Sequence, residues 1–292
     1  TVAVFTTGDA AAIVGVIGMM KLVVPLTARP AGIVQVTVWP AAVQPAVEDA
    51  NLASQASHIP LPPEAPESRI RYVLQAMLAI TALVLLSPVL AGEMTIQDII
   101  LNDHSWYAEH GITLHLGKKV SKIDRVQRRV IAEDGTEAPY DRLLLATGSN
   151  PFILPIPGND LPGVISYRDI HDTDSMIDAA KRYRHAVVIG GGLLGLEAAN
   201  GLKLRGMDVT VIHLADWLLE RQLDQTAGRM LQKSLEDRGL KFLLGRQTEM
   251  LIAGESGRVA ALRLKDGAQI PADLVVMAVG IRPNTTLAEA AG

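Results

Sequence analysis

The sequence contains no cysteine, and aromatic residues make up only 4% of its 292 positions. Without thiolates this chain cannot form a disulfide, a cysteine-ligated zinc site, an iron–sulfur cluster or a dithiol catalytic pair. This composition fits a reducing, cytoplasmic compartment. No metal site is predicted in the chain.

Charge of either sign is also in short supply, since 27 Lys and Arg are set against 31 Asp and Glu, for a net charge of −4. No long basic block is present, so nucleic acid and anionic membrane surfaces are not expected partners. The length allows two domains. The chain starts at Thr1 without a methionine and stops at Gly292, and we expect it to be a fragment.

Residues 1–84 lack a regular pattern. Six prolines fall between Pro40 and Pro66, which is typical of an irregular linker. No G-x-G-x-x-G occurs in this part of the sequence.

One long uncharged run covers residues 73–92 and follows the basic Arg69 and Arg71. Its length and flanking charge fit a membrane span. They also fit a buried helix that ends near Ser87-Pro88, where proline interrupts the pattern. Of the two interpretations we favour the buried helix.

From residue 93 the pattern becomes that of a regular α/β protein. Apolar spacing over 95–107 predicts a helix. Asp134-Gly135 predicts a hairpin turn, because glycine adopts positive φ at little cost. A proline-rich stretch at 150–158 predicts a hinge between domains. Short apolar or alternating runs predict strands at 112–116, 119–124, 128–133 and 142–148.

The strongest chemical signal is a glycine-rich run that follows an apolar strand at 186–189 and opens a helix closed by Gly206. A second strand at 208–212 completes the β-turn-α-β context in which G-x-G-x-x-G binds dinucleotides. The alternative is an empty scaffold of the same fold. The run consists of Gly190, Gly191, Gly192, Leu193, Leu194 and Gly195.

Three glycines of this run have separate tasks. Gly190 permits the tight turn, Gly192 lets the backbone approach a pyrophosphate, and Gly195 lets helix and strand pack closely. The amide groups and dipole at the helix N-terminus then stabilise the phosphate charge. Glu197 lies in the first turn of this helix. A favourable interaction with the helix dipole explains a glutamate there without any binding role.

The choice between NADH and NADPH stays open. An Asp or Glu is expected about 20 residues after the turn, at the end of the second strand, to bind the ribose 2′-hydroxyl. That position holds His213, and Arg221 is close enough in sequence to reach a 2′-phosphate. The alternative for His213 is a surface residue that caps the strand.

Several motifs carry a family resemblance. RLLLATGSNP at 142–151, VVIGGGLLGLEAA at 187–199 and DLVVMAVGIRPNT at 273–285 resemble the pyridine-nucleotide reductases that hold FAD and NAD(P)H in two related domains. With LLSPVLAGE at 85–93 and LLERQLD at 218–224, the chain is similar to the large subunit of assimilatory NAD(P)H-dependent nitrite reductase. The resemblance covers residues 85–292.

This resemblance implies roles for further residues. Thr147 and Gly148 would lie against FAD, Glu197 near the nicotinamide, and Gly280 in the loop that closes the NAD(P) domain. Arg168 would lie near the hinge and the flavin. From the residues alone, Thr147-Gly148 also fits a plain strand-end turn, and Arg168 a solvated charge at a helix start.

The N-terminal part departs from this family, which begins with its own FAD-binding glycine turn. Residues 20–24 resemble the first strand of that motif and 30–33 its turn, but PLTAR stands between them. A frameshift, a damaged gene or a chimeric gene would explain this, and the nucleotide sequence would decide. The resemblance places a second FAD motif, and the siroheme and iron–sulfur regions, after Gly292.

We therefore predict an α/β fold with two Rossmann-like dinucleotide-binding domains, the first of them incomplete. Residues 1–84 form an atypical region, 85–150 the remainder of an FAD-binding domain, and 151–292 an NAD(P)-binding domain. The predicted activity is FAD-dependent oxidation of NAD(P)H as the electron-entry part of a nitrite reductase large subunit, with no general acid–base pair.

Two alternatives are kept beside this activity: a ferredoxin- or rubredoxin-reductase-like flavoprotein, and a nucleotide-binding module without turnover. The expected partner is an electron-acceptor domain or a carrier protein. A homodimer is kept open.

Overall fold

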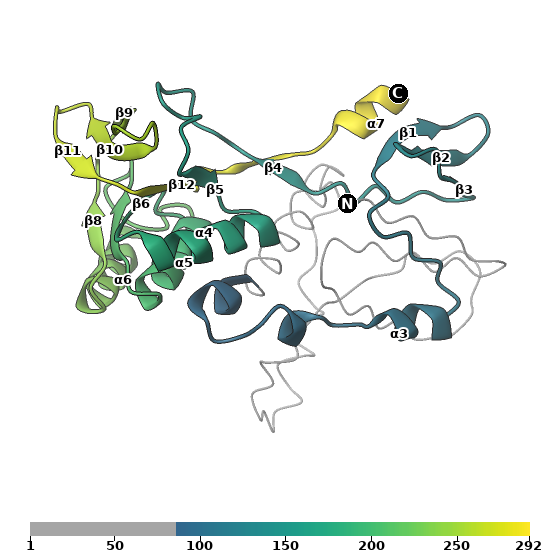
Figure 1. Cartoon of the computed structure of the whole chain (residues 1–292), viewed down its shortest axis with the longest axis horizontal. Coiled ribbons are helices and arrows are strands. Elements are labelled where there is room, and N and C mark those ends of the chain that lie inside the picture. The colour runs from purple at the N-terminus through teal and green to yellow at the C-terminus, as the bar shows by residue number, and fades with distance from the viewer. Residues whose placement is uncertain (1–85) are drawn as a thin grey trace. The chain divides into compact units, whose positions relative to one another are not determined.

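The computed structural model describes residues 86–292, which divide into two compact units (Figure 1). The meander unit comprises Ile100–Ala146 and Leu287–Gly292. The sheet unit comprises residues 86–99 and Thr147–Thr286.

The meander unit contains a short helix and three antiparallel strands. Helix α3 (His104–Glu109) begins at Asp103, whose side chain accepts from the Trp106 amide. The strands are β1 (Val120–Asp124), β2 (Arg129–Ala132) and β3 (Glu137–Pro139), paired in that order. The predicted hairpin turn is confirmed between β2 and β3, where Gly135 has φ +84°. Helix α7 (Thr286–Ala291) packs Leu287 and Ala291 against the apolar side chains of this meander.

The sheet unit is built on five parallel strands in the order β5-β12-β6-β7-β8. Their side chains are mostly Val, Ile and Leu, as expected for strands that are covered on both faces. Val187, Val209 and Val275 are fully buried at its centre. The bounds are β5 (Val164–Ser166), β6 (His185–Ile189), β7 (Asp208–Ile212), β8 (Lys241–Leu243) and β12 (Leu274–Met277).

Three helices accompany this sheet. Helix α5 (Leu193–Leu204) follows β6 directly, packs on β6 and β7, and lies beside α4 (Ile170–Arg182) (Figure 1). Helix α6 (Gln225–Asp237) leads into β8. The strand at 186–189, the helix closed by Gly206 and the strand at 208–212 are therefore confirmed.

A second, antiparallel sheet covers another part of the core. Its strands are β9 (Thr248–Ala253), β10 (Val259–Leu264) and β11 (Gln269–Pro271). Leu251 and Leu262 of this sheet pack with Val187 and Val275 of the parallel sheet in one apolar cluster. This contact fixes the antiparallel sheet on the parallel one.

Two short strands lie at the ends of the sheet unit. β4 (Ser149–Pro151) pairs antiparallel with β13 (Ile281–Pro283), and β13 follows β12 closely along the chain. Side chains reinforce the pairing, because Thr147 Oγ1 donates to the Asn284 carbonyl at 2.5 Å. The predicted hinge at 150–158 therefore begins within a paired strand.

Residues 86–91 form a helix that belongs to the sheet unit. Leu90 is fully buried against α5, where a Cβ on Gly201 would stand 2.6 Å from Leu90 Cγ. Arg205 donates to the carbonyl oxygens of Val89 and Leu90, which satisfies the end of this helix. Residues 86–99, which the sequence groups with the remainder of the FAD domain, thus pack on the helix of the glycine run.

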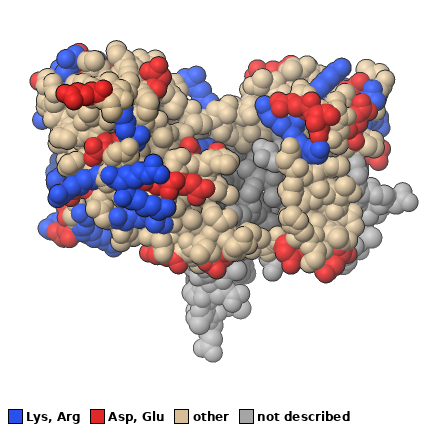
Figure 2. Space-filling view, in the orientation of Figure 1, with Lys and Arg blue, Asp and Glu red and all other residues tan. Residues whose placement is uncertain are grey.

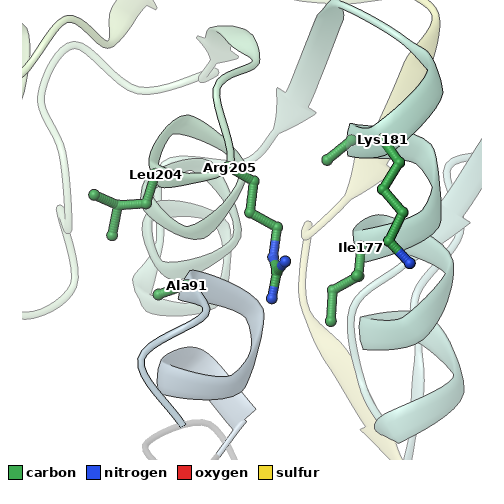
Figure 3. A pocket seen from close by; sticks show the side chains of 6 residues that line it. Ala91, Ile177, Lys181, Leu204 and Arg205 are labelled. Atoms are coloured by element: carbon green, nitrogen blue, oxygen red, sulfur yellow. The ribbon is translucent and has the colours of Figure 1, made fainter. Parts of the chain in front are cut away.

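An open pocket lies beside this contact, between the C-terminal ends of α4 and α5. Figure 3 shows the Arg205 side chain between the two helices, with Ile177 and Lys181 of α4 on one side and Ala91 on the other, while the Leu204 side chain points away from α4. Lysine and arginine side chains gather over this part of the sheet unit (Figure 2). Basic residues in a last helical turn interact favourably with the helix dipole, so the fold itself gives a reason for the charge.

Three predicted elements are wrong. The helix predicted over 95–107 is a 3-10 turn, η1 (Gln97–Ile99), and the separate α3. Asp98 accepts from the Thr95 amide and Asp103 caps the start of α3, and these local bonds favour two short elements over one helix. No strand occurs at 112–116 or 142–148. Neither run forms a backbone ladder with a described strand, since only the last residue, Gly148, accepts from the Asn284 amide, and an extended chain without such pairing is not a sheet strand.

The uncharged run at 73–92 lies largely outside the described residues. Within residues 86–292, no helix has both the length and the apolar character needed to cross a membrane.

Candidate functional site

The glycine turn joins β6 to α5 and is shaped by two close backbone contacts. Gly190 has φ +122°, and a Cβ there would stand 2.2 Å from the Ala278 carbonyl oxygen. A Cβ on Gly195 would stand 1.9 Å from the Gly190 carbonyl oxygen. Because both neighbours are backbone atoms, neither glycine tolerates a side chain without a shift of the chain.

Gly192 differs from these two glycines, since its Cβ would meet no atom within 4 Å. It is the N-cap of α5 and provides no side-chain bond to the first helical turn. No other described side chain caps this helix, so the first amide groups of the helix have no side-chain partner within the described residues. Leu193 is exposed and Leu194 half-buried, so they form an apolar rim beside these amides.

Gly191, at the variable position of the motif, is held from both sides. Its amide donates to His213 Nδ1 at 3.0 Å, and its carbonyl accepts from the Leu219 amide at 3.1 Å. A Cβ on Gly191 would stand 2.8 Å from His213 Cγ and 2.9 Å from Leu218 Cδ2. Glycine at position 191, the middle of the three consecutive glycines, is therefore required by the packing of the imidazole ring.

His213 follows β7, and it is buried, so the interpretation as a surface cap is wrong. Its Nε2 lies 2.9 Å from Glu220 Oε2. Because a backbone amide can only donate, Nδ1 accepts from Gly191 and the Nε2 proton points to Glu220. Sequence reasoning missed Glu220, whose only signal was its place in the LLERQLD motif. Arg221 is exposed and pairs with no described residue.

Glu197 is the fifth residue of α5, so its predicted place in the first turn is wrong by one turn. The helix starts earlier than expected, and a carboxylate beyond the first turn gains little from the dipole. Glu197 lies near the fully buried Tyr167. Burial raises the pKa of Tyr167 to about 12, the nearby Ser87 hydroxyl lowers it, and the charge of Glu197 raises it further.

Arg168 is half-buried, not a freely solvated charge. Its backbone amide donates to Asp172 Oδ2 at 2.7 Å, and its Nε donates to the Ser149 carbonyl at 3.3 Å. Ser166 donates to the same Asp172 oxygen. Burial raises the pKa of Asp172, and the neighbouring Asp169 carboxylate adds to the rise. Arg168 thus links the start of α4 to the paired strand β4.

The residues predicted to face a flavin lie at the crossing of β4 and β13. The Gly148 carbonyl accepts from the Asn284 amide at 3.0 Å, and Thr147 bonds the same residue. Gly280 has φ +117°, and its carbonyl accepts from the Phe152 amide at 2.9 Å. The structure thus brings Thr147, Gly148, Arg168 and Gly280 to one crossing of strands.

The loop after β12 connects this crossing to the glycine turn. Ala278, the residue after β12, bonds Ile189 through its amide, and its carbonyl lies against Gly190. The site therefore has two parts on one unit. One part is the glycine turn, which comprises residues 190–195 with His213 and Glu220. The other part is the strand crossing, which comprises Thr147, Gly148, Arg168 and Gly280.

The fit of cofactors can be judged from unsatisfied polar groups. The uncapped amides of α5 fit the pyrophosphate of a dinucleotide. Ser87 Oγ, Ser149 Oγ and Tyr167 OH are buried and have no hydrogen-bond partner among the described residues. Buried hydroxyls normally have partners, so these three are unsatisfied polar groups of the described residues, and one of them, Ser149, lies in β4 at the strand crossing. Residues 20–33, where the first glycine turn is expected, lie outside the described residues.

No group of three side chains suited to hold a metal ion occurs within residues 86–292. The phosphate-binding turn between two parallel strands instead defines a dinucleotide-binding protein. Comparison with known proteins is more specific: the pyridine nucleotide-disulphide oxidoreductases match residues 68–292. The chain belongs to this family.

Relatives with curated names support the narrower resemblance. The chain is 58% identical to a nitrite reductase [NAD(P)H] of Bacillus subtilis (strain 168) over 209 residues, covering 72% of this chain and 26% of that one. It is 49% identical to the assimilatory nitrate reductase electron transfer subunit of the same organism, covering 72% and 27%. The chain thus spans about a quarter of the length of either relative.

Among solved structures, the chain is similar to the putidaredoxin reductase–putidaredoxin complex, with a TM-score of 0.67 and 32% identity over 72% of this chain and 52% of that one. The predicted α/β reductase fold and the resemblance to nitrite reductase are confirmed. FAD and NAD(P)H are confirmed as the cofactors of the family.

Proposed function

We propose that the chain is the electron-entry part of an NAD(P)H-dependent, FAD-carrying reductase of the nitrite reductase type. One observation carries the proposal: the N-terminus of α5 is uncapped and open at Gly192, directly after a parallel strand. Similarity to nitrite reductases supports this acceptor class. The siroheme and iron–sulfur chemistry then belongs to a longer protein, since this chain has no cysteine.

In this proposal the residues of the turn hold the dinucleotide. Amides of Leu193, Leu194 and Gly195 face the pyrophosphate, and Gly192 leaves the approach free. Gly190 and Gly195 keep strand and helix close enough for this geometry. Glu197, deeper in α5, borders the nicotinamide end of the site.

The crossing of β4 and β13 would position the flavin. Thr147 and Gly148 belong to the strand that leads to it, and Arg168 is tied to the same strand through the Ser149 carbonyl. Gly280 closes the loop after β12. The bound cofactors supply the hydride chemistry, while the protein supplies position, burial and electrostatics, so no general acid–base pair is needed.

A second candidate is a reductase that passes electrons to a separate ferredoxin- or rubredoxin-type carrier. The similarity to putidaredoxin reductase favours it. A third candidate is a nucleotide-binding module without turnover. It is kept because residues 20–33, where the family has its FAD-binding glycine turn, depart from that motif in sequence. The proposal includes a cytoplasmic location and domain boundaries after residues 84 and 150. It leaves open whether the protein forms a homodimer.

The test is an absorbance spectrum of the purified chain followed by titration with NADH and NADPH. A flavin spectrum that bleaches with either nucleotide is the expected result. A colourless protein that binds a nucleotide would leave only the binding module. To separate the first two candidates, a longer clone is assayed for nitrite reduction without an added carrier protein.

A further inference from the structure

We infer that Glu220 is the residue that binds the adenosine ribose, that His213 positions it, and that the site therefore selects NADH over NADPH. This rests on the proposed function. The usual acceptor for the ribose hydroxyls is a carboxylate at the end of the second strand, and here a histidine occupies that place. The carboxylate instead comes from the segment that follows.

The first support is that the segment after β7, residues 213–220, is hydrogen-bonded to the glycine turn. The Leu219 amide bonds the Gly191 carbonyl, and the His213 ring bonds the Gly191 amide. Leu219 has φ +54°, a left-handed conformation that non-glycine residues rarely adopt and that persists only where the surroundings impose it. This bend brings the next residue, Glu220, against the imidazole.

The second support is the state of the Glu220 carboxylate. Oε2 accepts the Nε2 proton of His213 at 2.9 Å, while the side chain keeps a third of its surface exposed. One oxygen is thus fixed, and further lone pairs remain for the hydroxyls of a ribose. Through His213, which follows β7 and bonds Gly191, the carboxylate lies beside the carboxyl end of β7 and the glycine turn, where a dinucleotide places its adenosine ribose.

The third support is charge. A carboxylate that accepts from the 2′-hydroxyl of NADH meets a phosphate of the same sign in NADPH. Arg221, the neighbouring cation, is exposed and has no partner within the described residues to hold it over the same point. The carboxylate bonded to His213 is therefore the charge that the structure fixes at this position, and it disfavours a 2′-phosphate.

The experiment measures calorimetric Kd values of the full chain for NAD+ and NADP+, which bind without transferring a hydride. We expect wild type to bind NAD+ at least about tenfold more tightly, the effect of one hydrogen bond to a charged group. Glu220→Gln should bring the two Kd values within about threefold of each other. Asp216→Asn is the matched control, because it removes a carboxylate from the same segment, and it should keep the wild-type ratio.

His213→Phe tests the positioning role. It keeps a ring against Gly191 but removes both hydrogen bonds, so the ratio of the two Kd values should fall while the Kd for NADP+ changes little. An equal loss of affinity for both nucleotides would mean that His213 is only structural. Thermal unfolding checks that each variant is folded.

Two outcomes overturn the inference in different ways. If the preference for NAD+ survives Glu220→Gln, or is lost in Asp216→Asn, Glu220 is not the ribose acceptor although the proposed function stands. If wild type binds neither nucleotide, the proposed function fails and the inference fails with it.

Discussion

Three helices of the sheet unit have almost the same length but begin in two different ways. α4 and α6 start at Asp169 and Asp224, whose side chains accept from amides three residues on. α5 starts at Gly192, which offers no such bond. The capped helices satisfy their first amide groups within the fold, whereas the uncapped one leaves them without a side-chain partner, as the proposed phosphate site requires.

The largest expected effect comes from placing a side chain where the backbone of α5 contacts the backbone that follows β6. Gly195→Ala places a methyl 1.9 Å from the Gly190 carbonyl oxygen, and we expect a loss of about 3 kcal/mol in unfolding free energy together with loss of nucleotide binding. Chemical denaturation and calorimetry measure the two effects. A variant of wild-type stability would mean that the backbone contact is not needed.

Gly192→Ala separates binding from stability. The added methyl meets no atom of the chain, so the unfolding free energy should change by less than about 1 kcal/mol. The methyl does enter the path of the phosphate, and the Kd for NADH should rise at least about tenfold. Unchanged affinity at unchanged stability would show that the open side of the turn does not receive the ligand.

Asp224→Ala removes the cap of α6 and serves as the opposite case. Its carboxylate accepts from the Ala227 amide at 2.8 Å, so we expect a loss of about 1 kcal/mol in stability. Nucleotide affinity should stay the same. Asp224→Asn retains an acceptor and should recover most of the loss, which a thermal melt of both variants will show.

The smallest effect concerns pH at the start of α4. Burial raises the pKa of Asp172 in the folded protein, so the folded state holds this proton more tightly than the unfolded chain. The stabilisation is fully present below the unfolded pKa of about 4 and is lost as pH rises through the higher folded pKa. Asp172→Asn should flatten this fall in melting temperature as the pH rises above about 4. An identical slope in wild type and variant would contradict the assignment.

The sequence predicts the local parts of the site well. A strand, a glycine run, a helix and a second strand lie next to each other along the chain, and each glycine has a steric reason within that unit. The hairpin at Gly135 is predicted for the same reason, since the turn depends on its own residues.

Features that depend on distant neighbours were not predicted. The run at 142–148 has the composition of a buried strand, yet a strand needs a partner that composition does not reveal. The predicted helix at 95–107 fails for a local reason instead, because Asp98 and Asp103 bond amide groups three residues away and these bonds outweigh the apolar spacing. Glu220 could not be found from spacing, because the bend at Leu219 brings it to His213 from outside the expected strand end.

The contact between Gly191 and the ring of His213 has a consequence for how these sequences vary among relatives. The three successive glycines look like one flexible run, but the middle one, Gly191, is required because it packs against His213, 22 positions away. Substitutions at the two positions should therefore be correlated. Where residue 213 is small, residue 191 is free to carry a side chain, and where a ring is kept, glycine should be kept with it.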